Sequence, residues 1–166
     1  MKKKWSKFIF FVILVLSANG LLAQITMTKL DHVQLMKQFL GNWKAELGQD
    51  SVGTLICKSF YSGFDFYFKI EVKGKTVFEE KTLSGYDKKY DKLIKIWIQN
   101  TDPEFGILTL WFTTPSRCEE VLFEDIDNPA AAKYKWIFDF KSPDLLIWSD
   151  LLNNKVINTY TFNRIK

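Results

Sequence analysis

Side chains that commonly bind metals are scarce in this 166-residue sequence, which has one histidine, His32, and two cysteines, Cys57 and Cys118. Structural zinc sites usually take four ligands, mostly histidine and cysteine. One histidine and two cysteines about 60 residues apart do not supply such a set, so we expect no metal and no cofactor. The G-x-S-x-G, P-loop and G-x-G-x-x-G motifs are also missing. With no recognisable catalytic arrangement, we expect a protein that is not an enzyme.

An excess of positive charge is found only at the start of the chain. The 23 basic residues exceed the 19 acidic ones by four, and residues 1–23 hold four lysines (Lys2, Lys3, Lys4 and Lys7) and no acid. Without that segment, 19 basic residues face 19 acidic ones and the net charge is zero. Nucleic-acid binding depends on a basic surface that displaces counterions. The balanced charge therefore predicts no nucleic-acid partner.

No apolar run is long enough to cross a bilayer, which takes about 20 residues. The run Phe8–Leu16 has nine, follows the lysines and precedes small residues, a pattern typical of a secretory signal peptide. We predict a signal peptide over residues 1–23, cleaved after Ala23 or Gly20, no transmembrane segment after cleavage, and a single domain over residues 24–166. The expected location is a bacterial-type periplasm or the extracellular space. An uncleaved membrane anchor is the alternative.

The two cysteines have two possible states in such a compartment. An oxidising environment permits a disulfide between Cys57 and Cys118. It would close a loop of about 60 residues, worth roughly 4 kcal/mol in the chain-entropy model. Two separate buried thiols are the alternative, because the sequence does not give the distance between the two side chains.

Helical periodicity appears in one segment, and the remainder is typical of β-strands. Asp31 can cap a helix over residues 31–40, which Gly41 ends. From residue 42 onward, short runs rich in β-branched and aromatic residues alternate with glycine or proline at short intervals, which favours an all-β sandwich or barrel. The predicted strands are Asn42–Leu47, Thr54–Tyr61, Phe64–Val72, Thr76–Ser84, Lys92–Gln99, Ile107–Thr113, Glu120–Asp125, Tyr134–Lys141, Leu145–Asp150 and Lys155–Arg164.

Tight turns between successive strands favour an up-and-down antiparallel barrel of 8–10 strands, closed or nearly closed, because closure removes exposed edges. In 64–72, Phe64, Phe66 and Phe68 alternate with mostly polar residues and mark a buried face. Strands 92–99 and 107–113 are apolar on both faces, so which of their faces points inward stays open. An outer-membrane barrel is disfavoured, because lysines occur on both faces of the strands.

Several motifs resemble the lipocalins of the calycin superfamily. The segment Phe39-Leu40-Gly41-Asn42-Trp43 is similar to the lipocalin G-x-W signature, in which the tryptophan closes one end of the barrel against a basic residue of the last strand. The resemblance implies Arg164 as that partner. Gly85-Tyr86-Asp87, followed by Trp97-Ile98-Gln99-Asn100, resembles an uncharacterised group of secreted bacterial lipocalin-like proteins. That group commonly has aspartate where Gln99 stands, and it has no established activity.

A closed barrel of this size either encloses a small cavity or fills its interior with side chains. The favoured hypothesis is non-enzymatic binding of a small hydrophobic or amphipathic molecule, such as a lipid, in an aromatic pocket. The alternative is a structural or interaction module with a filled interior, whose outer surface would present Tyr61, Tyr67, Trp111 and Trp148. The candidate ligand-binding residues of the barrel wall are Phe66, Phe68, Tyr86, Trp97, Gln99, Trp111 and Trp136.

Overall fold

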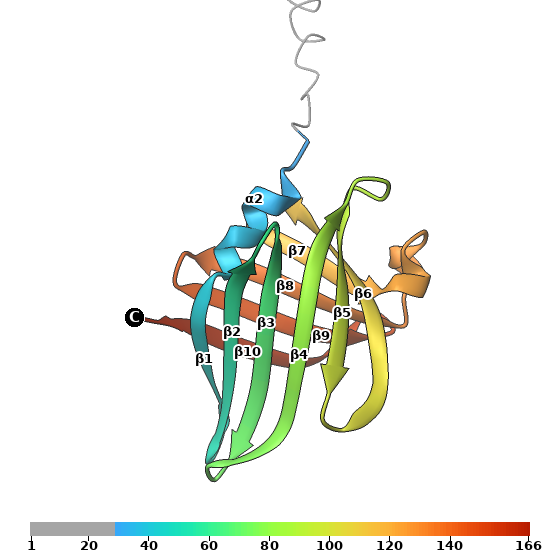
Figure 1. Ribbon diagram of the computed structural model, residues 1–166. Helices are drawn as coiled ribbons and strands as arrows, with labels where there is room; N and C mark the ends of the chain where they lie inside the picture. Colours follow the sequence, from blue (N-terminus) through green and yellow to red (C-terminus); the bar gives the residue numbers. More distant parts are fainter. Residues whose placement is uncertain (1–28) are drawn as a thin grey trace, which may run out of the picture.

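The computed structural model describes residues 29–166, which form a closed barrel of ten antiparallel strands with a short helical segment at one end (Figure 1). The predicted all-β barrel is confirmed; the predicted signal peptide lies outside the described residues. The helical segment is α2 (His32–Met36) and the 3₁₀ turn η1 (Lys37–Phe39). The strands are β1 (Gly41–Gly48), β2 (Ser51–Phe60), β3 (Gly63–Val72), β4 (Lys75–Asp87), β5 (Lys92–Gln99), β6 (Asp102–Thr114), β7 (Arg117–Leu122), β8 (Tyr134–Ser142), β9 (Leu145–Leu152) and β10 (Lys155–Ile165).

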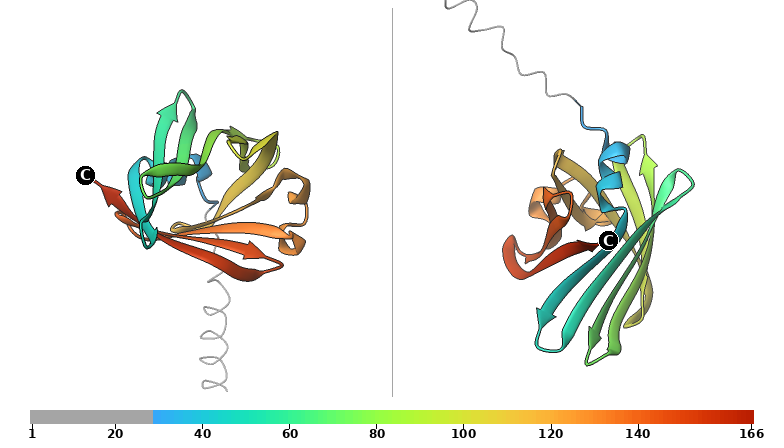
Figure 2. Two further views of the ribbon diagram at one scale, coloured as in Figure 1. Left: turned by 90° about the horizontal axis from the view of Figure 1, so that it is seen from below. Right: turned by 90° about the vertical axis from the view of Figure 1, so that its left-hand side faces the viewer.

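Each strand pairs with its neighbour in sequence, and β1 pairs with β10 to close the barrel. The hairpins therefore alternate between the two ends of the barrel. The helical segment lies at the end where β1 begins and β10 finishes; it lies behind the ring of strands when the barrel is seen from below (Figure 2). We call this the helix end, and the other the open end.

The seventh strand differs from its prediction. It runs from Arg117 to Leu122 rather than over residues 120–125. Residues Phe123–Asp125 instead form the 3₁₀ turn η2, in which the amide of Ile126 donates to the carbonyl of Phe123 at 3.1 Å. A further 3₁₀ turn, η3 (Pro129–Ala131), precedes β8. Glu124 and Asp125, which the sequence pattern assigned to the seventh strand, are therefore part of the β7–β8 connection.

The helical segment blocks its end of the barrel. Asp31 caps α2, because its carboxylate accepts a hydrogen bond from the amide of Gln34 at 2.9 Å. Phe39 inserts among the strands and packs edge-on against Phe66, Phe138 and Phe140, with ring centroids 4.8–5.7 Å apart. This end of the barrel interior is consequently filled with aromatic side chains.

Trp43 and Arg164 are cross-strand neighbours where β1 and β10 pair. Trp43 is fully buried, and the guanidinium carbon of Arg164 lies 4.0 Å from the centroid of its ring. The same guanidinium donates to the backbone carbonyls of Leu40, Gln38 and Pro143. The contact that the G-x-W resemblance implies is thus present, and it fastens the helical segment to the last strand.

The alternating phenylalanines of β3 face the barrel interior: Phe64, Phe66 and Phe68 are each no more than 6% exposed. The structure also shows which faces of β5 and β6 point into the barrel, a choice that the sequence pattern left open. In β5 the inward residues are Leu93, Lys95 and Trp97, whereas Ile96 and Ile98 are more than half exposed on the outside. In β6 the inward residues are Leu108, Leu110 and Phe112.

The disulfide that the sequence allowed is not formed. Cys57 and Cys118 are both free and buried. They lie on β2 and β7, which are not paired with each other. Burial raises the pKa of Cys57 to about 12, and it also raises that of Cys118. Both side chains therefore serve as small apolar core residues.

Candidate functional site

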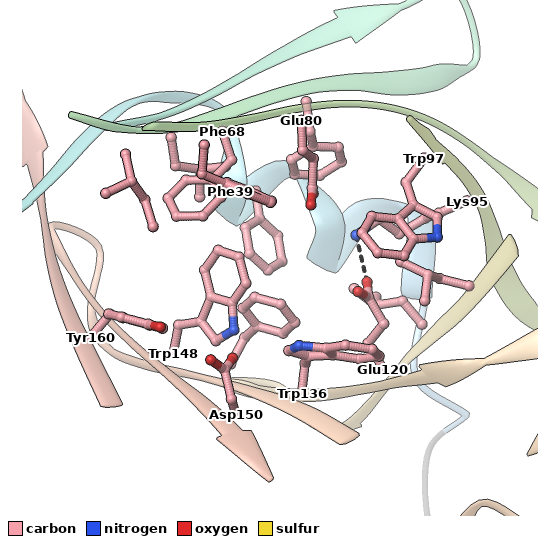
Figure 3. Close-up of a pocket in the computed structure, with 17 residues that line it drawn as sticks. Phe39, Phe68, Glu80, Lys95, Trp97, Glu120, Trp136, Trp148, Asp150 and Tyr160 are labelled. Carbon is pink, nitrogen blue, oxygen red and sulfur yellow. Dashed lines mark hydrogen bonds and ion pairs between the residues drawn. The ribbon is translucent and has the colours of Figure 1, made fainter. Parts of the chain in front are cut away.

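The barrel encloses a cavity of about 250 Å³ between the helix end and the open end (Figure 3). Its volume lies just below the range of about 300–1,000 Å³ that is usual for small-molecule sites. At about 30 Å³ per water molecule, it has room for on the order of eight waters. The interior is thus not filled, and its volume suits a compact molecule rather than a long acyl chain.

Aromatic side chains make up most of the cavity wall, and they come from opposite sides of the barrel. Phe68 of β3, Phe138 of β8 and Trp148 of β9 lie close together, with ring centroids 5.0 Å and 5.1 Å from Trp148. Phe39 forms the floor at the helix end. Such a wall supplies apolar surface together with the polarisable faces of aromatic rings.

Access to the cavity is from the open end. On β3, β5 and β8 the lining residue nearer the helix is buried, and the last one towards the other end is only half-buried. Phe138 is followed in this way by Trp136, and Lys95 by Trp97. The helical segment covers the other end, so the end opposite α2 is the less covered one.

A buried ion pair lies within the wall. The ammonium of Lys95 is 2.5 Å from a carboxylate oxygen of Glu120, and their side chains are 8% and 6% exposed. The ammonium also lies 5.2 Å from the ring centroid of Phe66. Desolvating two charges costs several kcal/mol per ion and is offset only by good geometry, so a buried pair is weak evidence of a stabilising role.

Glu80 is a second carboxylate beside this pair. Burial raises its pKa, and the negative charge of Glu120 raises it further, whereas Lys95 and a hydrogen bond from Thr82 act in the opposite direction. The Thr82 hydroxyl donates to Glu80 at 3.3 Å. One lysine is therefore shared, electrostatically, between two carboxylates.

Three polar atoms of cavity-lining residues are buried and have no hydrogen-bond partner within the described part of the chain: Oδ1 of Asp150 and the indole nitrogens of Trp97 and Trp148. The indole nitrogen of Trp97 packs against Gly106 of β6 rather than facing the cavity. The other oxygen of Asp150 accepts from the amide of Asn158 at 3.1 Å. Burial is the main cause that raises the pKa of Tyr160 to about 12; the negative charge of Asp150 and a weak hydrogen bond to that carboxylate act in the same direction. Buried polar atoms normally have partners, so the atoms of Asp150 and Trp148 are candidates to contact a ligand or water.

The structure brings together four of the seven residues predicted to bind a ligand. Phe66, Phe68, Trp97 and Trp136 all line the cavity.

The other three predicted wall residues lie elsewhere. Tyr86 is near the helix end and donates to the carboxylate of Asp91. Gln99 is at the end of β5, opposite Glu80, and is not part of the lining. Trp111 is on the outer face of β6, because Leu110 and Phe112 face inward, and the ammonium of Lys92 lies 4.4 Å from the centroid of its ring.

Of the residues assigned to an outer interaction surface, Trp148 instead lines the cavity. Tyr61 is 94% exposed, and Tyr67 donates to Glu79 at 2.9 Å.

Sequence reasoning did not predict the charged and polar lining residues Glu80, Lys95, Glu120 and Asp150. A signal for one of them was present: Lys95 is two residues from the predicted wall residue Trp97 and therefore lies on the same face of the strand. The others belong to strands whose inward face depends on pairing with distant neighbours.

Within residues 29–166, no three histidine, cysteine, aspartate or glutamate side chains are arranged so as to hold a metal ion. None of the helices in that same range is long and apolar enough to cross a membrane. A scan against protein-family models found no match, and a search of curated proteins found no significant similarity.

Proposed function

We propose that this protein binds one small amphipathic molecule non-covalently inside the barrel, without transforming it. The observation that carries the proposal is the cavity of about 250 Å³, which combines an aromatic wall with buried polar atoms that lack partners in the described chain. A barrel evolved only as a structural module would gain stability by filling this space.

The proposal includes a lipocalin-like identity and export from the cytoplasm. The closed antiparallel barrel is compatible with a lipocalin-like fold, and the contact between Trp43 and Arg164 supports the likeness. Export rests on the signal-peptide pattern of residues 1–23. Intact-mass measurement of protein recovered from its own cells tests it, since an uncut Met1 would contradict cleavage.

Apolar burial sets the scale of the affinity. One aromatic ring buries about 150–250 Å², which at about 25 cal/mol per Å² contributes roughly 4–6 kcal/mol. That corresponds to dissociation constants from about 1 mM down to tens of micromolar. Tighter binding requires polar contacts, which the unpartnered atoms in the wall are placed to make.

A cavity-filling variant tests the proposal. Leu108 lines the cavity and is 3% exposed, so Leu108→Phe places extra volume in the lumen. With 2-phenylethanol as the probe and calorimetry as the readout, we expect the unmodified protein to bind and Leu108→Phe to bind at least tenfold more weakly, with no loss of Tm. The matched control is Leu83→Phe on the outer face, where Leu83 is 47% exposed. This control should bind the probe as the unmodified protein does.

Two results would contradict the proposal. One is the absence of binding of any small apolar probe to the unmodified protein. The other is equal binding by Leu108→Phe and Leu83→Phe, which would place the probe outside the barrel.

A further inference from the structure

The charges lining the cavity are unevenly balanced, and they bear on which head group a ligand can carry. Three carboxylates line the cavity, those of Glu80, Glu120 and Asp150, against one ammonium, that of Lys95. Lys95 is already in contact with Glu120. The described lining therefore has no free cation to receive an anionic ligand, and a carboxylate placed there would face like charge in a medium of low dielectric constant.

Asp150 lies on the same wall of the cavity as Glu120 but is separated from the Lys95–Glu120 pair by Trp136, which is in register between them (Figure 3). It belongs to β9, and its cross-strand neighbour on β8 is Trp136. Its Oδ1 is buried, and apart from a weak interaction with the Tyr160 hydroxyl the carboxylate oxygen has no partner in the described chain, so it can accept a hydrogen bond from a ligand. A charged N–H donor would form the stronger, charge-assisted type of bond at this position.

Aromatic rings surround this carboxylate. Trp136 is opposite it across the β8–β9 ladder, and Trp148 precedes it by two residues on the same face of β9. Tyr160 is the cross-strand neighbour of Trp148, with ring centroids 5.9 Å apart. Rings of this kind attract a cation to their faces, and such cages are a known means of recognising ammonium groups.

We propose that the cavity selects a small organic cation, an amine with an apolar or aromatic body, over neutral and anionic molecules of the same size. The ammonium group contacts Asp150 among the rings of Trp136, Trp148 and Tyr160, towards the open end. The apolar body extends inward against Phe68 and Phe138. This inference rests on the proposed function and specifies its ligand class.

The unpaired indole nitrogen of Trp148 defines the competing possibility. As a donor, its N–H group favours an oxygen acceptor such as a hydroxyl or a carboxylate. The test therefore compares three probes that share one phenyl ring: 2-phenylethylamine, which is a cation at neutral pH, 2-phenylethanol, which is neutral, and 3-phenylpropionate, which is an anion.

Calorimetric titration of the unmodified protein gives the primary result, and it does not depend on any variant folding. We expect 2-phenylethylamine to bind at least tenfold more tightly than 2-phenylethanol, with 3-phenylpropionate the weakest. Asp150→Asn keeps the shape but removes the charge, so it should lower the affinity for the amine at least tenfold and leave that for the alcohol within twofold. The matched control is Asp127→Asn, an exposed position in the β7–β8 connection, which should change neither.

The outcomes separate this inference from the function on which it rests. Alcohol binding that equals or exceeds amine binding overturns the cation selectivity and leaves the proposed function standing. Tightest binding of 3-phenylpropionate also overturns the cation selectivity, leaves the proposed function standing and assigns the site to the indole N–H of Trp148. An amine preference that survives in Asp150→Asn overturns the assigned role of Asp150. Failure of all three probes to bind overturns both proposals.

Discussion

Substitution of Arg164 is the most direct test of how the barrel is closed. Its guanidinium stacks on Trp43 and donates to three backbone carbonyls, at 2.9 Å for Gln38 and Pro143 and with a further bond to Leu40. Arg164→Lys keeps the positive charge but loses the planar fork, so it cannot reach three acceptors and stack at the same time.

The expected loss follows from these contacts. A hydrogen bond to a charged group contributes about 1.5–3 kcal/mol, and a cation–π contact about 0.5–2 kcal/mol. The terms are not additive, and the Arg164 side chain is 23% exposed, so water can replace part of what is lost. We therefore expect Arg164→Lys to lower the free energy of unfolding by about 2–4 kcal/mol, a large share of the roughly 5–15 kcal/mol that is typical of a domain.

Urea denaturation followed by tryptophan fluorescence measures this effect, with the change read from the midpoint at constant slope. The control is Arg117→Lys, the other arginine of the chain, whose side chain is 37% exposed and pairs with Asp139 at 3.1 Å. Exposed pairs contribute about 0–1 kcal/mol. If the two substitutions cost the same, or if Arg164→Lys costs less than about 1 kcal/mol, closure does not depend on this residue.

Two further predictions concern single contacts. Burial lowers the pKa of His32, whose Nδ1 accepts a hydrogen bond from the Phe112 amide. The contribution of this neutral histidine to the free energy of unfolding is therefore fully present above about pH 6.5 and is lost as the pH falls below that value. His32→Asn should flatten the profile of the urea midpoint from pH 7.5 to 5.5; an unchanged slope would refute this. A Cβ on Gly106 would lie 1.4 Å from Nε1 of Trp97, so Gly106→Ala should shift the tryptophan emission and cost about 1–3 kcal/mol in urea unfolding. At Gly85 a Cβ meets nothing within 4 Å, so equal effects of Gly85→Ala would contradict the crowding argument.

The titration of Glu80 changes the stability with pH in the direction opposite to that of His32. Burial raises the pKa of Glu80, so the folded state holds that proton more tightly than the unfolded chain, and this group favours folding as the pH falls. Both proteins in the comparison carry Glu80, and therefore the difference between their profiles isolates His32. It is the chain's only histidine, which removes the usual second source of titration near neutral pH.

Local pattern was enough to predict the barrel. Alternation in β3 is a property of consecutive residues. It places Phe64, Phe66 and Phe68 together on one buried face, independently of the rest of the chain. The start of the helical segment was equally readable, because Asp31 needs only the next turn of chain to act as a cap. The pairing of β1 with β10 was expected from the removal of exposed strand edges by closure and from the G-x-W resemblance, not from any local pattern.

The inward face of β5 could not be predicted in this way. Isoleucines alternate with leucine, lysine and tryptophan, so hydrophobicity alone favours the isoleucine face. Pairing with the neighbours decides otherwise: Trp97 is held between Thr82 of β4 and Gly106 of β6, both on the lumen side. Ile96 is left outside, 51% exposed. The inward face of this strand is thus a tertiary property.

Polar residues in the lumen give the strongest reason to regard the barrel as a binding protein. Lys95 and Glu120 are 25 residues apart on strands that are not neighbours, so their contact exists only across the folded interior. Replacing such a pair by packed apolar side chains is often neutral or stabilising. A barrel that served only as a scaffold would gain nothing from the pair, nor from a half-satisfied Asp150 beside a cavity. Departures from good packing of this kind are expected where a protein recognises another molecule.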